Sequence, residues 1–78
     1  MPTLAQIGPY RFFFYSNEGD EPPHVHVKRE DNVAKFWLEP TALAEDGGLR
    51  KHQLREIQRL VAENRAAWIE AWHEYFGS

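Results

Sequence analysis

Pro22-Pro23-His24-Val25-His26-Val27 is the stretch of sequence from which the fold is best worked out. Each proline fixes its own φ near about −65° and pushes the residue before it toward extended backbone. The chain therefore reaches His24 stiff and extended. From there histidine and valine alternate, which is the period of a β-strand with one apolar and one polar face. The stretch predicts a strand that sets two imidazoles on one face and two valines on the other.

The next residues predict a hairpin. Glu30-Asp31-Asn32 is a turn, and Val33–Leu38 returns as the second strand. An Asp31-Asn32 loop would place His26 opposite Trp37, whereas a Glu30-Asp31 loop would place His24 there. Both registers put a tryptophan beside a histidine on the same face.

The segments on either side of this hairpin extend the sheet. Tyr10–Ser16 is rich in aromatic residues and apolar on both faces, so we expect a central strand or one whose second face is covered. Thr3–Ile7 and Thr41–Leu43 are candidates for short additional strands. The expected sheet is antiparallel, has three to four strands and lies within residues 3–44.

Residues 50–76 show helical periodicity, with Asn64 as one interruption of the apolar stripe. Read as one helix they span about 40 Å, which exceeds the diameter of about 30 Å expected for a domain of this size. A straight helix would therefore overhang its sheet and need a cover, for which a second copy of the chain is the simplest source. The alternative is a kink near Asn64.

These elements predict an α+β fold in which one long C-terminal helix packs on the sheet face of Val25, Val27 and Phe36. The 78 residues form a single domain, residues 1–78, with 42% hydrophobic and 14% aromatic side chains. There is no cysteine, which excludes disulfides and thiolate metal sites. No secretory signal pattern and no apolar run of membrane-spanning length is present, so we expect a cytoplasmic protein without membrane contact.

His24 and His26 are the candidate functional residues. Residues i and i+2 of a strand share a face, so both imidazoles can bind one divalent metal ion, with a third ligand from Glu18, Asp20 or Glu21. The same pair suits acid–base catalysis on a phosphate, with Lys28 or Lys35 holding the charge. The third interpretation is structural: half-buried histidines that pack on Trp37 and bond to the backbone.

Two further groups of residues are candidates for partner binding. Lys51, Arg55 and Arg59 lie at i, i+4 and i+8 on one helix face, which fits either an acidic partner or a solvated surface. The aromatic residues at the end of the chain fit either a core or an interface. The residues expected to bind a partner are Trp37, Arg55, Arg59, Trp68, Trp72, Tyr75 and Phe76. The net charge of −3 argues against a dedicated nucleic-acid binder.

Several motifs together resemble one small bacterial family, domain of unknown function 4160. They are Met1-Pro2-Thr3, the aromatic strand Tyr10–Tyr15, the Pro-Pro-His-x-His-Val core at Pro22–Val27, and Trp72-His73-Glu74-Tyr75-Phe76. The resemblance covers nearly the whole chain. It implies a prokaryotic cytoplasmic protein with a small protein partner, in some cases within a toxin–antitoxin-like module. It supplies no catalytic residues.

Two functions follow as hypotheses. The first is a protein-interaction module that acts as a homodimer or with a small partner protein, of toxin–antitoxin type. The alternative is a small RNA-cleaving toxin or a metal-dependent hydrolase that uses His24 and His26, with a divalent metal as its cofactor.

Overall fold

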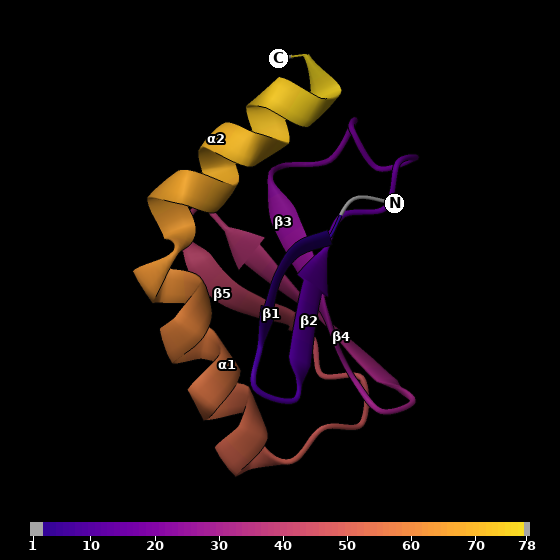
Figure 1. Ribbon diagram of the computed structural model, residues 1–78, viewed down its shortest axis with the longest axis vertical. Helices are drawn as coiled ribbons and strands as arrows, with labels where there is room; N and C mark the ends of the chain where they lie inside the picture. The colour runs from indigo at the N-terminus through magenta and orange to yellow at the C-terminus, as the bar shows by residue number, and fades with distance from the viewer. Residues whose placement is uncertain (1–2, 78) are drawn as a thin grey trace.

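The computed structural model describes residues 3–77, which form one sheet with two helices on one of its faces (Figure 1). The strands are β1 (Thr3–Ile7), β2 (Tyr10–Phe13), β3 (His24–Arg29), β4 (Asn32–Leu38) and β5 (Thr41–Glu45), and the helices are α1 (Lys51–Glu63) and α2 (Arg65–Phe76). The sheet is antiparallel with the order β1-β2-β3-β4-β5, so each strand lies beside its neighbours in sequence. Met1 and Pro2, part of the motif at the start of the chain, lie outside the described residues, as does Ser78.

The α+β class is confirmed, but the expected three to four strands are five. Both candidates for short additional strands, Thr3–Ile7 and Thr41–Leu43, are strands. The second of them, β5, continues to Glu45, one residue past the expected limit of the sheet. The reason is backbone pairing. β1 pairs with β2 and β5 pairs with β4, so each edge segment bonds to an aromatic-rich strand that would otherwise present open N–H and C=O groups. Within residues 3–77 neither helix is long and apolar enough to cross a membrane.

The hairpin between β3 and β4 has the second of the two predicted registers. His24 pairs with Trp37 and Val25 pairs with Phe36, which leaves Glu30 and Asp31 as the loop. Glu30 takes a positive φ of 56° to close it. The other predicted register, with His26 opposite Trp37, is wrong, because His26 pairs with Lys35.

The helices pack on the sheet face that the sequence predicted. Val25, Val27 and Phe36 belong to one core cluster with residues of both helices. The helix residues fully or nearly buried in that cluster are Ile57, Val61 and Trp68. Each such side chain contributes about 1.5–3 kcal/mol of hydrophobic stabilisation. This layer fixes β3 from behind and leaves its histidine face for other contacts.

β2 is buried on both faces, as its sequence predicted. Phe12 points to the helices, with its ring centre 4.8 Å from that of Trp68. Phe13 points the other way and stacks on His26 at 5.7 Å. The strand ends at Phe13 rather than Ser16, and Phe14 packs edge-on against Trp72.

The single long helix is wrong, and the kink near Asn64 is confirmed. Asn64 separates α1 from α2, with φ −106° and ψ 8°. Its side-chain amide donates to the Leu60 carbonyl at 2.8 Å, and its backbone N–H donates to the carbonyls of Leu60 and Val61. A side chain that competes for helix carbonyls in this way is a known cause of helix bending. Arg65 then donates from Nε to the Leu38 carbonyl at 2.8 Å, which fixes the start of α2 to the sheet.

The bend removes the expected overhang. The longest extent of the molecule is 34 Å, and Trp68 and Trp72 are 5% and 2% exposed. The far end of α2 reaches the loop between β2 and β3, where Gly19 lies directly against the Phe76 ring (Figure 1). The cover for these aromatic residues therefore comes from this chain itself.

Candidate metal centre

His24 and His26 lie at the start of β3, directly after the two prolines. They share one face of the strand, as alternation predicts, and both are buried. Their ring centres are 5.1 Å apart. The side chain of His24 is 0% exposed and that of His26 is 8% exposed, so they are more deeply buried than the half-buried histidines that the sequence suggested.

Glu18 brings a carboxylate to both histidines from the loop between β2 and β3. Its Oε1 lies 2.8 Å from His24 Nε2 and 2.7 Å from His26 Nε2. One ligand atom from each of the three residues lies within 4.8 Å of the others. Of the three acids considered as third ligand, the structure brings only Glu18 to the histidines; Asp20 is exposed, and Glu21 binds Lys35.

The orientation of the His24 ring is fixed by the backbone. Nδ1 lies 3.0 Å from the Pro22 carbonyl oxygen, which can only accept, so Nδ1 carries a proton and donates it. A neutral His24 then turns the lone pair of Nε2 toward Glu18 Oε1, which is also an acceptor. His26 does not meet this conflict, because its Nε2–H can donate to the same oxygen. The space between His24 and Glu18 therefore has to contain either an additional proton or a cation.

Aromatic rings enclose the two imidazoles. His26 packs against both Phe13 and Tyr15, with the Tyr15 ring centre 4.4 Å away. His24 meets Trp37 at 5.6 Å and Trp72 at 4.8 Å. The site thus combines residues of β3, β4, α2 and the loop that carries Glu18. Such a shell limits rotation of both rings and lowers the local dielectric.

The electrostatics favour a charged Glu18 beside a neutral His26. Burial acts to raise the pKa of Glu18, but hydrogen bonds from His24 and His26 outweigh it and hold that pKa below its usual value. Burial lowers the pKa of His26 and outweighs the opposing effect of Glu18. A carboxylate and a neutral imidazole are the forms in which these residues bind metal.

Lys35, rather than Lys28, is the cation beside the histidines. Lys35 is paired with His26 across the hairpin, and its Nζ lies 2.7 Å from Glu21 Oε1 and 4.5 Å from the centre of the Trp37 ring. Lys28 was a catalytic candidate beside the two histidines, but it is exposed, with Arg11 and Val33 as its strand neighbours. Strand alternation places Lys28 on the same face of β3 as the histidines. It lies two residues past His26 along the strand, away from Glu18.

The predicted partner-binding residues do not form one surface. Trp68 lies in the core, and Trp72 packs between His24, Phe14 and Phe76. Tyr75 is 45% exposed, and Arg55 and Arg59 are exposed on α1, where Arg59 binds Glu63. The buried pair corrects the expectation that these tryptophans need a second copy as cover.

The part of α2 in this site was not found from the sequence. Helical periodicity assigns Trp72 to an apolar face but cannot show that the face continues past the sheet to His24. The contact depends on the bend at Asn64, which directs α2 toward the loop between β2 and β3. The sequence signal for Glu18 was the acidic loop before the histidines, which offered Asp20 and Glu21 as equal alternatives.

The family model for a domain of unknown function, DUF4160, matches residues 10–73 of this chain. The matched range contains every residue of the cluster and all four aromatic residues around it. Comparison with curated proteins and with solved structures gave no significant match.

Proposed function

The chain belongs to the DUF4160 family, and from the geometry of its buried cluster we propose that it binds one divalent transition-metal ion and uses it in hydrolysis. The ligands are Glu18 Oε1, His24 Nε2 and His26 Nε2. The observation that carries the proposal is the convergence of both Nε2 atoms on one carboxylate oxygen while His24 Nδ1 is bound to Pro22. A cation between them would be bound by Glu18 Oε1, by the Nε2 lone pair of His24, and by His26 Nε2 in the tautomer that carries its proton on Nδ1.

The donor set fits the proposal. Two imidazoles and one carboxylate are a ligand set of catalytic zinc sites and of other first-row metals. Metal-binding histidines usually donate their second ring N–H to a carbonyl or carboxylate, which orients the ring. For His24 the acceptor of this N–H is the Pro22 carbonyl oxygen. The ring contacts of Phe13, Tyr15, Trp37 and Trp72 hold the imidazoles in place around the site.

A hydrolytic role is supported by the number of protein ligands. Three ligands leave a coordination position for water, and a zinc ion in such a site lowers the pKa of its bound water to about 7. Glu18 is 20% exposed, whereas the histidines are buried, so solvent reaches the cluster from the side of the loop. Lys35 lies across the hairpin from His26, but its charge is paired with Glu21. The positive charge that favours an anionic substrate such as a phosphodiester would therefore come from the bound metal ion.

Metal binding is tested by titrating purified protein with Zn²⁺ and Mn²⁺ in a calorimeter and by measuring bound metal by mass spectrometry. Wild type should bind one ion. Glu18→Gln keeps the shape of the side chain and removes one ligand charge, so affinity should fall by at least about tenfold. Asp20→Asn is the matched control, since it removes a carboxylate from the same loop, and it should leave affinity unchanged.

Hydrolysis is tested with the metal-loaded protein on single-stranded RNA and on bis(p-nitrophenyl) phosphate. Activity should be lost in Glu18→Gln and kept in Asp20→Asn. Equal affinity of both variants for metal would overturn the metal centre. Metal binding without turnover of either substrate would contradict hydrolysis and leave the ion a structural role, in which it joins the loop to β3.

The interaction module suggested by the sequence has lost part of its support, because Trp68 and Trp72 are covered within the chain. Tyr75, Arg55 and Arg59 remain exposed candidates. We retain partner binding, including a toxin–antitoxin pairing, as a prediction that sedimentation or size-exclusion mass measurement can check.

A further inference from the structure

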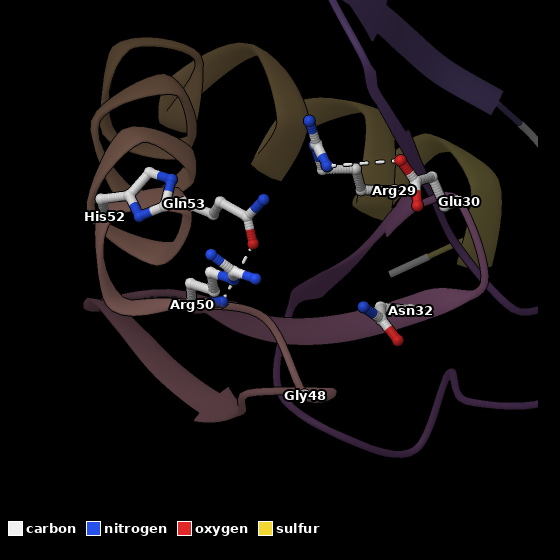
Figure 2. Close-up of a pocket in the computed structure, with 7 residues that line it drawn as sticks. All are labelled: Arg29, Glu30, Asn32, Gly48, Arg50, His52 and Gln53. Atoms are coloured by element: carbon white, nitrogen blue, oxygen red, sulfur yellow. Dashed lines mark hydrogen bonds and ion pairs between the residues drawn. The ribbon is translucent and has the colours of Figure 1, made fainter.

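A second polar site lies at the end of the molecule away from the metal cluster. It is a cavity of about 360 Å³ between the β3–β4 hairpin and the start of α1. Figure 2 shows Arg29 on the hairpin side of this space and Arg50 and Gln53 on the helix side. Its volume is at the lower end of the range for small-molecule pockets. The lining is polar, which favours a small polar ligand over an apolar one.

The charge around this cavity is mainly positive. Arg29 and Arg50 contribute two guanidinium groups, and His52 adds a group that can become cationic. Glu30 is the acid among the lining residues. Its carboxylate is 3.6 Å from Arg29 and 81% exposed, so this ion pair is long, solvated and worth little. A net positive potential therefore remains in the cavity.

Arg29 has hydrogen-bonding capacity left over. Its Nε is shielded from solvent and has no acceptor among residues 3–77. An N–H that is buried without an acceptor destabilises the folded state. The Nε and terminal N–H groups of arginine form a fork that matches two oxygens of a phosphate or carboxylate. A ligand with such oxygens would remove this cost.

The start of α1 carries charges of the unexpected sign. The first turn of a helix has free N–H groups and a partial positive charge, so acids stabilise it and cations destabilise it. In α1 the first turn has no acid, and Arg50 precedes Lys51 and His52. Cations at this position therefore destabilise the start of the helix. An anion bound in the cavity would neutralise both the side chains and the helix end.

We propose that the cavity between Arg29 and Arg50 binds a phosphate group, either as free phosphate or as the phosphate of a nucleotide. Phosphate carries nearly two negative charges at neutral pH and several acceptor oxygens. Arg29 takes two of these oxygens, Arg50 contacts the group from the helix side, and the amides of Asn32 and Gln53 provide neutral donors at the rim. This inference is independent of the metal cluster.

The test measures binding by calorimetry and by ¹⁵N NMR shifts at constant ionic strength, with inorganic phosphate, adenosine monophosphate and chloride as probes. Protein is first dialysed against a chelator, so that phosphate cannot act through a metal at Glu18. Phosphate should shift the amide signals of residues 29–32 and 48–53, and chloride should not. Arg50→Gln should weaken binding at least about tenfold, and Arg55→Gln, the same change on the same helix outside the cavity, should not weaken it.

Two results would overturn the proposal. One is the absence of a phosphate-specific shift relative to chloride. The other is an equal loss of affinity in Arg50→Gln and Arg55→Gln, which would indicate unspecific charge attraction. If the nucleotide binds at least about tenfold tighter than phosphate, the ligand is a nucleotide; similar affinities identify the free anion. Circular dichroism of each variant confirms that it is folded.

Discussion

Glu18 shows how far single residues of this site could be predicted. The strand alternation at Pro22–Val27 predicts that His24 and His26 share a face, and it is confirmed. The same pattern cannot choose among the three acids of the preceding loop. That choice depends on two contacts between residues distant in sequence. Gly19 packs against the Phe76 ring, and Glu21 accepts a hydrogen bond from Lys35. Loop geometry of this kind is set by the folded molecule and not by local preference.

Tyr10 makes the stability of the fold decrease with pH in the alkaline range. Its hydroxyl donates to Glu56 at 2.8 Å, and burial followed by this hydrogen bond raises the pKa of Tyr10 above 10.0. A raised pKa in the folded state means that the neutral phenol stabilises the fold below pH 10 and that this contribution is lost as pH rises through the folded pKa. Tyr10→Phe should cost about 1 kcal/mol at pH 8 through the lost hydrogen bond.

Above about pH 10 that difference should shrink, because the phenyl ring of the variant cannot ionise while wild type loses the contribution of its neutral phenol. Urea unfolding of both proteins from about pH 8 to pH 11 measures it. Tyr75→Phe, a change at an exposed ring, should show no comparable pH dependence relative to wild type. A difference between wild type and Tyr10→Phe that stays constant across this range would contradict the assignment.

At the scale of elements, periodicity predicts helix over residues 50–76 but not its division. Leu54, Ile57 and Val61 continue in phase with Trp68, so the pattern alone fits one helix or two. Asn64 is the local signal for a break, and its effect depends on the Leu60 carbonyl. The direction of α2 is set by Arg65 on the Leu38 carbonyl, a contact between helix and sheet that no local pattern contains.

The connection from β5 to α1 depends on a glycine that packs against the sheet. Gly8 and Gly47 both have positive φ, 57° and 61°, so alanine at either costs about 1–2 kcal/mol in backbone strain. At Gly8 an added Cβ would meet nothing within 4 Å, whereas at Gly47 it would overlap the Val33 carbonyl. Gly47→Ala should therefore destabilise the protein by about 1–3 kcal/mol more than Gly8→Ala.

Thermal and urea unfolding of the two variants checks this difference. The shared strain cancels between them, so the comparison isolates the overlap. Equal destabilisation would show that the connection can move away from β4 without cost. Because the loop also borders the phosphate cavity at Gly48, displaced NMR signals at residues 48–53 in Gly47→Ala would show how far such a movement extends.

At the scale of the whole molecule, the sequence predicts the α+β class and the buried face but not the compactness. The valine side of β3 identifies where the helices pack. The expected overhang assumed a straight helix, and the bend at Asn64 instead places Trp72 on His24. The site and the fold are therefore linked: the same side chain completes the core around Phe14 and covers the candidate ligands.

This link predicts that metal removal changes global stability. An ion held by Glu18, His24 and His26 would join the loop to β3 and bind only the folded chain, which stabilises the fold by about 2.7 kcal/mol at a hundredfold excess over Kd. Treatment with a chelator should lower Tm by about 10 °C or more, since 1 kcal/mol corresponds to roughly 4–8 °C in a domain of this size. Scanning calorimetry before and after chelation measures the shift.

Chelation should lower the Tm of Glu18→Gln by clearly less than that of wild type, because the variant binds the metal at least about tenfold more weakly. Asp20→Asn should respond as wild type does. If chelation leaves Tm unchanged in a wild-type protein shown to contain metal, the ion does not join the loop to the sheet and does not stabilise the fold.

The order of the strands has a consequence for how the chain folds. In a sheet ordered β1-β2-β3-β4-β5 every pairing joins consecutive segments. Three of the four connections have two residues and the one between β2 and β3 has ten, so closing them costs little chain entropy. Proteins dominated by such local pairings fold fast. The contacts between residues distant in sequence include those of Phe12 and Phe14 in the first part of the chain with Trp68 and Trp72 near its end. We expect the sheet to form before these contacts do. The histidines would then be enclosed only at a later step, when α2 packs against the sheet and the loop between β2 and β3.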